Sequence, residues 1–278
     1  MCSALGVSRQ GYYAWASRAP SAHDERDAEL ARMIGEAFEA SRGIYGSPKV
    51  WRMLRRDGVR TSRKRVARIM SEYGWRGTTR GNARRPKEAK KRAVQTPRAP
   101  DLVGRDFSAD GPNKAWFADI TYVRTRQGWL YMAAVMDIWS RKVVGWSMAP
   151  RMTAELADDA LRMAIARRRP PAGCIHHSDH GSQYASILVG KTMRDAGIRP
   201  SMGAISSPWD NAVTESLMGC IKSECVNARV YDSREQAALE IFDYIEGFYN
   251  PKRIHSALGW LSPDEFERTH RKNRTHAA

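Results

Sequence analysis

The sequence predicts an α/β catalytic unit preceded by a small all-helical domain. Residues from 114 to 250 are typical of three adjacent strands followed by helices and strands in alternation, in the order βββαβαβαα. Residues 21–76 carry helical spacing of apolar side chains, and a polar basic segment separates the two regions. A chain of 278 residues can form one large domain or two small ones with their own cores.

Positive charge is concentrated in the first part of the chain. The net charge is +16, and residues 1–100 hold 23 basic and 9 acidic side chains, whereas residues 101–278 hold 23 and 21. A basic arm before a nearly neutral body favours a polyanionic partner, with nucleic acid preferred over membrane. A basic surface that serves only solubility is the alternative.

The composition also excludes several classes of protein. The four cysteines form no CxxC pair, which argues against a zinc site or a disulfide framework and favours a reducing cytoplasm. No apolar run approaches the roughly 18 residues that a membrane span needs. The N-terminus lacks the apolar core of a signal peptide.

Residues 1–20 resemble part of a helix-turn-helix. In "ALGVSRQGYYAW", Gly6 suits the turn and Ser8 suits a helix cap. The first helix of such a motif would need residues that this chain does not contain, so the segment is either a remnant or the tail of a longer product. A frayed terminal helix fits equally well.

Residues 21–76 predict a helical DNA-binding domain. Helical spacing runs over 24–40, and a second helix is expected from a Ser47 cap and Pro48 to Gly58. The third helix, in "TSRKRVARIMSEYGW", turns Val66, Ile69 and Met70 inward and basic side chains outward. We expect DNA contacts from three of these basic residues, a solvated basic face being the alternative: Arg63, Lys64 and Arg68. The polar and basic composition of residues 77–105 predicts a linker that can lie along DNA phosphates.

Residues 106–250 predict the α/β unit element by element. "KAWFADITYVRT" and "GWLYMAAVMDIWS" are typical of strands joined by a turn at Gln127-Gly128, and "RKVVGWSMA" completes an antiparallel meander. A helix capped by Thr153, a strand in "AGCIHHSD", a helix ended by Gly197 and a strand in "IRPSMG" follow. Helices in "SPWDNAVTESLMGCIKSE" and "REQAALEIFDYIEGFYN" come next, and residues 251–278 predict a basic tail.

Three carboxylates predict a metal site. Asp119 lies in mid-strand, Asp179 follows the fourth strand at its carboxyl end, and Glu215 lies on the later helix. Three carboxylates that converge would repel one another, so a divalent cation is implied, and oxygen ligands favour Mg²⁺ or Mn²⁺. Two such ions about 4 Å apart can activate an attacking oxygen and stabilise a leaving oxygen at phosphorus. Lys222, seven residues after Glu215, should share its helix face.

The motifs together resemble a known family. Asp179 and Glu215 have 35 residues between them, and "FADITYV", "HHSDHGSQY" and "DNAVTES" accompany that spacing. The chain resembles the DDE transposases and retroviral integrases, most of all the second-frame (OrfB) products of the insertion sequence 3 family. "SRGIYGSPKVWRML", "YMAAVMDIWSRKVVGWS" and "YNPKRIHSALGWLSP" extend the resemblance over nearly the whole chain.

The resemblance implies an RNase H-like integrase core with Asp119, Asp179 and Glu215 as catalytic metal ligands and Lys222 as a DNA contact. It implies Mg²⁺-dependent cleavage and strand transfer at element ends, with a non-catalytic DNA-binding regulator of transposition as the alternative. The implied partners are double-stranded DNA at element ends and target, further copies of the chain on DNA, and an upstream-frame product fused by frameshifting. The implied location is the bacterial cytoplasm, at the nucleoid.

Other polar residues carry weaker expectations. Asp137 fits a turn cap or local ion pair better than a metal ligand. A histidine near Asp179 could orient it or touch DNA, although a structural hydrogen bond fits equally and no set completes a zinc site. Asp210 suits a helix start, and Trp209 suits either base stacking or packing. The histidines near Asp179 are His176, His177 and His180. For the tail residues Arg253 and His255, contact with DNA and an ordinary surface position with satisfied hydrogen bonds are equally open.

Overall fold

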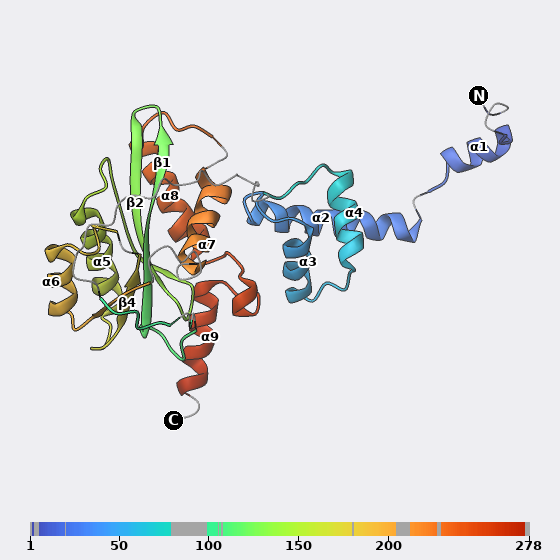
Figure 1. Cartoon of the computed structure of the whole chain (residues 1–278). Helices are drawn as coiled ribbons and strands as arrows, with labels where there is room; N and C mark the ends of the chain where they lie inside the picture. Colours follow the sequence, from blue (N-terminus) through green and yellow to red (C-terminus); the bar gives the residue numbers. More distant parts are fainter. Residues whose placement is uncertain are drawn as a thin grey trace. The chain divides into compact units, whose positions relative to one another are not determined.

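The computed structural model describes residues 2, 6–19, 21–78, 99–104, 106, 108–179, 181–203, 212–226 and 229–275. The chain divides into two compact units, residues 1–78 and 79–278, and Figure 1 shows the elements of both. Expectations for Asp210, Trp209 and His180 fall outside the described residues.

The first unit is built from helices, as expected. Helix α1 (Arg9–Ala16) begins at the Ser8 cap and buries none of its residues, and α2 (Ala22–Ala40), α3 (Ser47–Arg56) and α4 (Arg63–Glu72) pack together. The small core that they share is made of Leu30, Ala31, Ile34, Val50, Leu54, Val66, Ile69 and Met70. The inward side predicted for the third helix is confirmed.

One helix start differs from the expectation. Gly46, rather than Ser47, occupies the cap position of α3, and no side chain caps this helix. Ser47 and Pro48 form the first turn instead, because Pro48 lacks the N–H that would otherwise need a partner there. Thr153 does precede α5, but its side chain makes no capping hydrogen bond.

The second unit contains a five-stranded mixed sheet in the order β3-β2-β1-β4-β5. Strands β1 (Ala115–Thr125), β2 (Gly128–Asp137) and β3 (Val143–Ala149) form the predicted antiparallel meander. Strands β4 (Ile175–Ser178) and β5 (Arg199–Met202) add to the other edge of β1 in parallel. Strand β1 is therefore central, and its second half extends beyond its pairing with β4, which involves residues 115–117.

Helices cover both faces of this sheet (Figure 1). Helices α5 (Ala154–Arg168) and α6 (Ile187–Asp195) lie on one face over an apolar cluster that includes Trp116, Ala118 and Val189. Gly145 lets α5 approach closely, since a Cβ there would lie 2.2 Å from the carbonyl oxygen of Ala160.

The remaining helical elements follow in chain order. Helix α7 (Ala212–Ile221) contacts β1 and continues into a π-helical turn, η2 (Lys222–Val226). Helix α8 (Arg234–Asp243) leads into a second π-helical turn, η3 (Tyr244–Tyr249), then a short 3₁₀ turn, η4 (Ser256–Leu258), and α9 (Pro263–Thr275). None of the described helices combines the length and the apolar character that a membrane span requires.

Candidate functional site

The sheet register brings Asp119 and Asp179 to neighbouring positions. Phe117 of β1 pairs with His177 of β4 in parallel, and Asp119 and Asp179 each follow two residues later, so the same register continued past the end of β4 would put them at neighbouring positions. Neighbouring strands lie about 4.8 Å apart, and residues in register point to the same face. Because Ala118 faces the α5–α6 cluster, Asp119 faces the opposite side, where α7 packs on β1.

Helix α7 supplies the third carboxylate and the cation. Glu215 lies in its first turn and is half-buried. The sequence suggested one continuous α-helix through Lys222, and this is wrong in detail, since Lys222 is the first residue of the π-helical turn. The Ser223 hydroxyl donates to the Gly219 carbonyl at 2.7 Å within this turn. A π-turn widens the helix locally and changes the direction in which the following side chains leave it.

The charges of these residues converge on Asp119. The pKa of Asp119 is raised to about 7, mainly by burial and also by the negative charges of Asp179 and Glu215, although the Ile120 N–H and the Lys222 ammonium act in the opposite direction. Burial lowers the pKa of Lys222, and the charge of Asp119 opposes that change. Strand, loop and helix thus bring the three predicted carboxylates and the predicted cation into one electrostatic cluster.

The donor chemistry of this cluster fits a hard divalent cation, but the carboxylates stand apart. An Asp119 oxygen accepts a hydrogen bond from its neighbour Ile120 N at 2.8 Å, and Asp179 Oδ1 accepts one from Gly181 N at 3.0 Å. Within the described part of the chain, no three acidic, histidine or cysteine side chains meet closely enough to hold a metal ion. Like charges in one site favour such separation when nothing neutralises them.

Tyr184 joins the site and was missed by the sequence analysis. Its side chain is buried, and among the described residues its hydroxyl has no hydrogen-bond partner. Burial, followed by the charges of Asp119 and Asp179, raises the pKa of Tyr184 well above its ordinary value. A Cβ on Gly181 would lie 3.0 Å from Asp179 Oδ1 and 3.5 Å from Tyr184 Cδ2, so this glycine keeps the carboxylate and the ring close together. The sequence signal that could have pointed to Tyr184 was its position five residues after the candidate metal ligand Asp179.

The histidines beside Asp179 have structural roles. His177 is buried, and its Nδ1 lies 2.9 Å from Ser201 Oγ on β5. His176 is buried against the Tyr184 ring, and burial together with His177 lowers the pKa of His176 to about 4, so its ring is neutral near pH 7. The alternative of a structural hydrogen bond is therefore confirmed for His177, and His176 packs against an aromatic ring instead.

Asp137 is an anchor for the end of the sheet. It is fully buried, it accepts from the Trp139 N–H at 3.0 Å as the predicted turn cap, and it pairs with Arg168 of α5 at 3.1 Å. The ion pair between Asp137 and Arg168 therefore joins residues far apart in the sequence, unlike the local pair that was the alternative expectation. Arg168 also makes two hydrogen bonds of 2.8 Å to Glu267 of α9.

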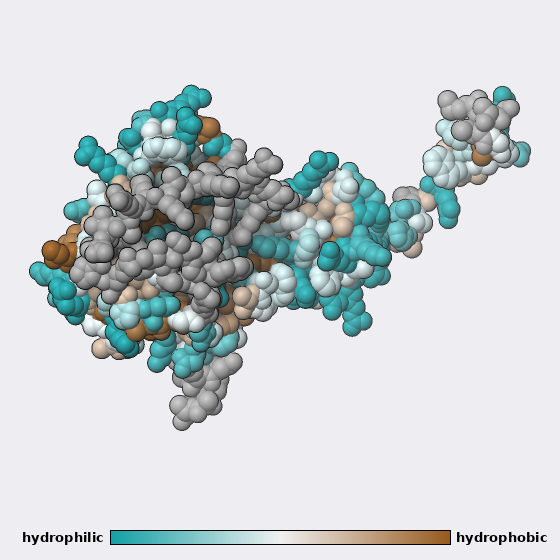
Figure 2. Space-filling model, in the orientation of Figure 1, coloured by the Kyte–Doolittle hydropathy of each residue, from teal (hydrophilic) through white to brown (hydrophobic). Residues whose placement is uncertain are grey.

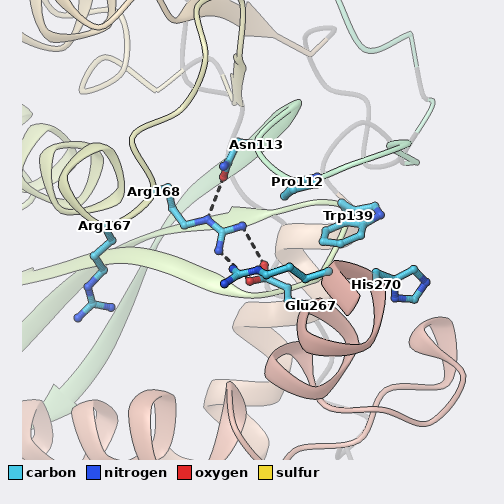
Figure 3. A pocket seen from close by; sticks show the side chains of 8 residues that line it. Pro112, Asn113, Trp139, Arg167, Arg168, Glu267 and His270 are labelled. Atoms are coloured by element: carbon cyan, nitrogen blue, oxygen red, sulfur yellow. Dashed lines mark hydrogen bonds and ion pairs between the residues drawn. The ribbon is translucent and has the colours of Figure 1, made fainter. Parts of the chain in front are cut away.

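A cavity of about 300 Å³ lies beside this anchor, separate from the carboxylates. Figure 3 shows Arg168 reaching between Asn113 and Glu267 along its wall. Arg168 is engaged by two carboxylates of the chain itself, Asp137 and Glu267, so the arrangement holds α9 against α5 and the sheet. The complete lining is Pro112, Asn113, Trp139, Arg167, Arg168, Glu267, His270 and Arg271.

Arg253 is buried and does not form part of an exposed basic tail. Its guanidinium donates to both oxygens of Glu224, at 2.7 and 2.6 Å, and to Cys220 Sγ at 3.1 Å. The Tyr244 hydroxyl donates to the same carboxylate at 2.7 Å. The expectation of DNA contact by Arg253 is therefore wrong, and the residue braces the turn that carries Lys222.

The basic residues predicted on α4 differ in their surroundings. Arg63, Lys64 and Arg68 are all exposed, but Arg68 also pairs with Asp27 of α2 and, at 2.7 Å, with Glu72. Arg68 therefore helps to join α4 to α2, and Arg63 and Lys64 remain the more accessible candidates for DNA. The visible surface of this unit is mostly hydrophilic (Figure 2).

Comparison with known proteins agrees with this geometry. An HTH-like domain model matches residues 24–83, and two integrase core domain models match residues 109–208 and 196–263. The transposase InsF of insertion sequence IS3A from Escherichia coli (strain K12) is 40% identical over 96% of this chain and 92% of its own length. An uncharacterized 31 kDa protein of insertion element IS600 from Shigella sonnei is 38% identical over 96% and 97%.

Solved structures with similarity to the chain include the catalytic core domain of HTLV-2 integrase in complex with magnesium. It aligns with a TM-score of 0.44 and 16% identity over 56% of this chain and 96% of that one. The integrase core models contain the strands and helix that carry the three carboxylates. With an HTH-like domain before an RNase H-like integrase core, and with such identity to InsF over almost its full length, the chain belongs to the transposases of the insertion sequence 3 family.

Proposed function

We propose that the chain catalyses divalent-metal-dependent DNA cleavage and strand transfer at the ends of an insertion sequence. The observation that carries this proposal is the convergence of Asp179, Glu215 and Lys222 on Asp119 within an integrase core. Three carboxylates with one cation suit phosphodiester chemistry, because the carboxylates can hold Mg²⁺ or Mn²⁺ and the cation can balance a phosphate.

Each residue of the cluster has a separate task. Asp119, Asp179 and Glu215 would hold the metal through carboxylate oxygens, and the bound metal would activate an attacking oxygen and stabilise a leaving one. Lys222 would lie against a phosphate oxygen near the scissile bond, where an ammonium offsets negative charge. The Tyr184 hydroxyl is free among the described residues to donate to a carboxylate oxygen and fix its orientation.

The helical unit would position the DNA ends. Exposed basic residues on α4, with Arg63 and Lys64 the most accessible of those predicted, suit phosphate contacts in duplex DNA at element ends and target. Each transposition event would require more than one copy of the chain, because two ends must meet. A protein that makes such contacts would act at the nucleoid in the bacterial cytoplasm.

Helix α1 suggests a further protein partner. Tyr13 and Trp15 are 68% and 71% exposed, and no residue of α1 is buried. An isolated helix of eight residues is marginal in water, so a surface that covers these aromatic side chains would stabilise it. An upstream-frame product joined by frameshifting is the partner we propose.

The test uses a plasmid that carries the cognate element ends, the purified chain joined to its upstream-frame product, and Mg²⁺. Strand cleavage and end joining should appear with Mg²⁺ or Mn²⁺ and disappear with a chelator. Glu215→Gln, which keeps size and polarity, should abolish both reactions while end binding persists. Cleavage retained by this variant would reject the role of Glu215, and a cleavage-deficient variant that kept its full biological effect on transposition would favour the non-catalytic regulator instead.

A further inference from the structure

Two large aromatic side chains are exposed together on the β1–β2 hairpin. Tyr122 and Trp129 are 52% and 44% exposed, and their rings meet edge to face with centroids 5.1 Å apart. A cross-strand aromatic pair stabilises a hairpin. That effect accounts for the contact between the rings but does not require both of them to face solvent.

The chain fixes the hairpin end that carries this pair. Arg234 of α8 donates from Nε to the Trp129 carbonyl at 3.0 Å and from Nη2 to the Gln127 carbonyl at 2.5 Å. The Thr125 hydroxyl donates to the Gly128 carbonyl at 2.7 Å across the turn. The exposed rings therefore stand on a braced support, and a rigid support reduces the entropy lost when a ligand binds.

A cation joins this pair to the candidate active site. Lys222 Nζ lies 4.8 Å from the centroid of the Tyr122 ring, and the charge of Lys222 also acts on Asp119. Tyr122 is three residues after Asp119 on β1, about 10 Å along an extended strand and on the opposite face of the sheet, so Lys222 is the link between the two. Arg124, exposed and paired in register with Trp129, adds positive charge beside the rings. The rings are thus flanked by basic side chains, and one of these, Lys222, also acts on Asp119.

We infer that Tyr122 and Trp129, the aromatic platform, bind an unpaired base of the DNA strand next to the scissile phosphodiester. Aromatic rings flanked by cations suit single-stranded nucleic acid, because the rings stack on a base and the cations contact its phosphates. The inference rests on the proposed function, since it takes DNA as the substrate. It adds that the DNA duplex is locally unpaired at the site and that the aromatic platform keeps the unpaired strand away from its complement.

The test measures DNA binding without metal, so that catalysis does not enter. One probe is a duplex with a short single-stranded overhang that carries a fluorescent purine analogue, and the other is the same duplex fully paired. Tyr122→Leu and Trp129→Leu keep apolar bulk in the hairpin but remove the flat ring. Phe242→Leu is the matched control, because Phe242 is 47% exposed and also makes an edge-to-face contact, with Trp146 at 5.7 Å.

The wild-type chain should prefer the overhang probe and quench the analogue on binding. Each platform variant should lose roughly ten-fold in overhang affinity, within the range measured for base stacking, and lose the quenching. Affinity for the paired duplex and the melting temperature should stay close to wild type, and the Phe242 variant should behave as wild type.

Three results would overturn the inference. Unchanged overhang affinity and quenching in both platform variants would show that no base stacks there. An equal loss on both probes would assign the rings to duplex binding, and a change of oligomeric state would assign them to a protein interface. In all three cases the proposed cleavage activity would stand. It would fall together with the inference only if the wild-type chain bound neither probe.

Discussion

Replacing Asp119 by asparagine should stabilise the metal-free protein above about pH 7. In the native chain burial and the neighbouring carboxylates raise the pKa of Asp119 from 3.8 to about 7. A pKa change of one unit corresponds to 1.36 kcal/mol, so full ionisation of the native carboxyl costs about 4 kcal/mol relative to the unfolded chain. Asparagine is of nearly equal size and never ionises, so the variant avoids that cost.

The sign of the pH dependence follows from proton binding. Between about pH 4 and pH 7 the native Asp119 keeps a proton that the unfolded chain has lost, so wild-type stability falls as pH rises through this window and levels off above it. The advantage of Asp119→Asn should therefore be near zero below about pH 4 and reach a few kcal/mol above about pH 7.

The assay is urea denaturation at a series of pH values with a chelator present. Asp159→Asn, at an exposed position on α5, controls for the loss of one negative charge. A constant difference between Asp119→Asn and wild type over the whole pH range would refute the reasoning. Added Mg²⁺ near pH 8 should then raise the wild-type free energy of unfolding and have a much smaller effect on the Asp119 variant, since binding to the native state alone stabilises it.

Three further predictions concern other parts of the chain. Glu215→Ala should abolish strand cleavage in a plasmid assay with gel-shift affinity for end DNA nearly unchanged, and retained cleavage would contradict its role. Arg63→Ala combined with Lys64→Ala should weaken end binding and reduce the slope of log affinity against log salt by about one to two, checked by fluorescence anisotropy; an unchanged slope would remove these residues from the interface. Glu224→Gln should lower the free energy of unfolding by about 3 kcal/mol in denaturant, because it leaves Arg253 buried without its counter-charge. The double variant with Arg253→Met should recover part of this loss, and additive losses would argue against coupling.

Much of the fold could be predicted because its signals are local. Val66, Ile69 and Met70 lie at helical spacing and are buried together, and the meander follows from three apolar runs with short turns. Asp119 was recognisable because a charge in the middle of an apolar strand costs free energy unless it has a function. Parallel pairing of β1 with β4 then places Asp179 beside it.

The features that the sequence analysis missed depend on partners far away in the chain. Arg253 looks like a residue of a basic tail, and only the fold shows that it is buried against Glu224 and Cys220. Glu224, the partner of Arg253, lies in the π-helical turn that begins at Lys222. Helical periodicity within α7 therefore could not predict the direction in which the Lys222 side chain leaves the helix. Arg68 appeared to be a free cation because its partner Asp27 lies on another helix.

Without a metal, burial and carboxylate repulsion disfavour the ionised form of Asp119, and a divalent cation would offset both effects. Asp119 is held in a partly buried position beside two other carboxylates, and each aspartate satisfies one oxygen with a nearby backbone N–H, those of Ile120 and Gly181. A cation between the carboxylates would offset both the repulsion and the cost of burial, and it would favour the ionised form of Asp119. The same residue therefore links folding stability, proton binding and metal binding. This linkage makes stability measurements with and without Mg²⁺ a direct test of Asp119 as a metal ligand, independent of any DNA substrate.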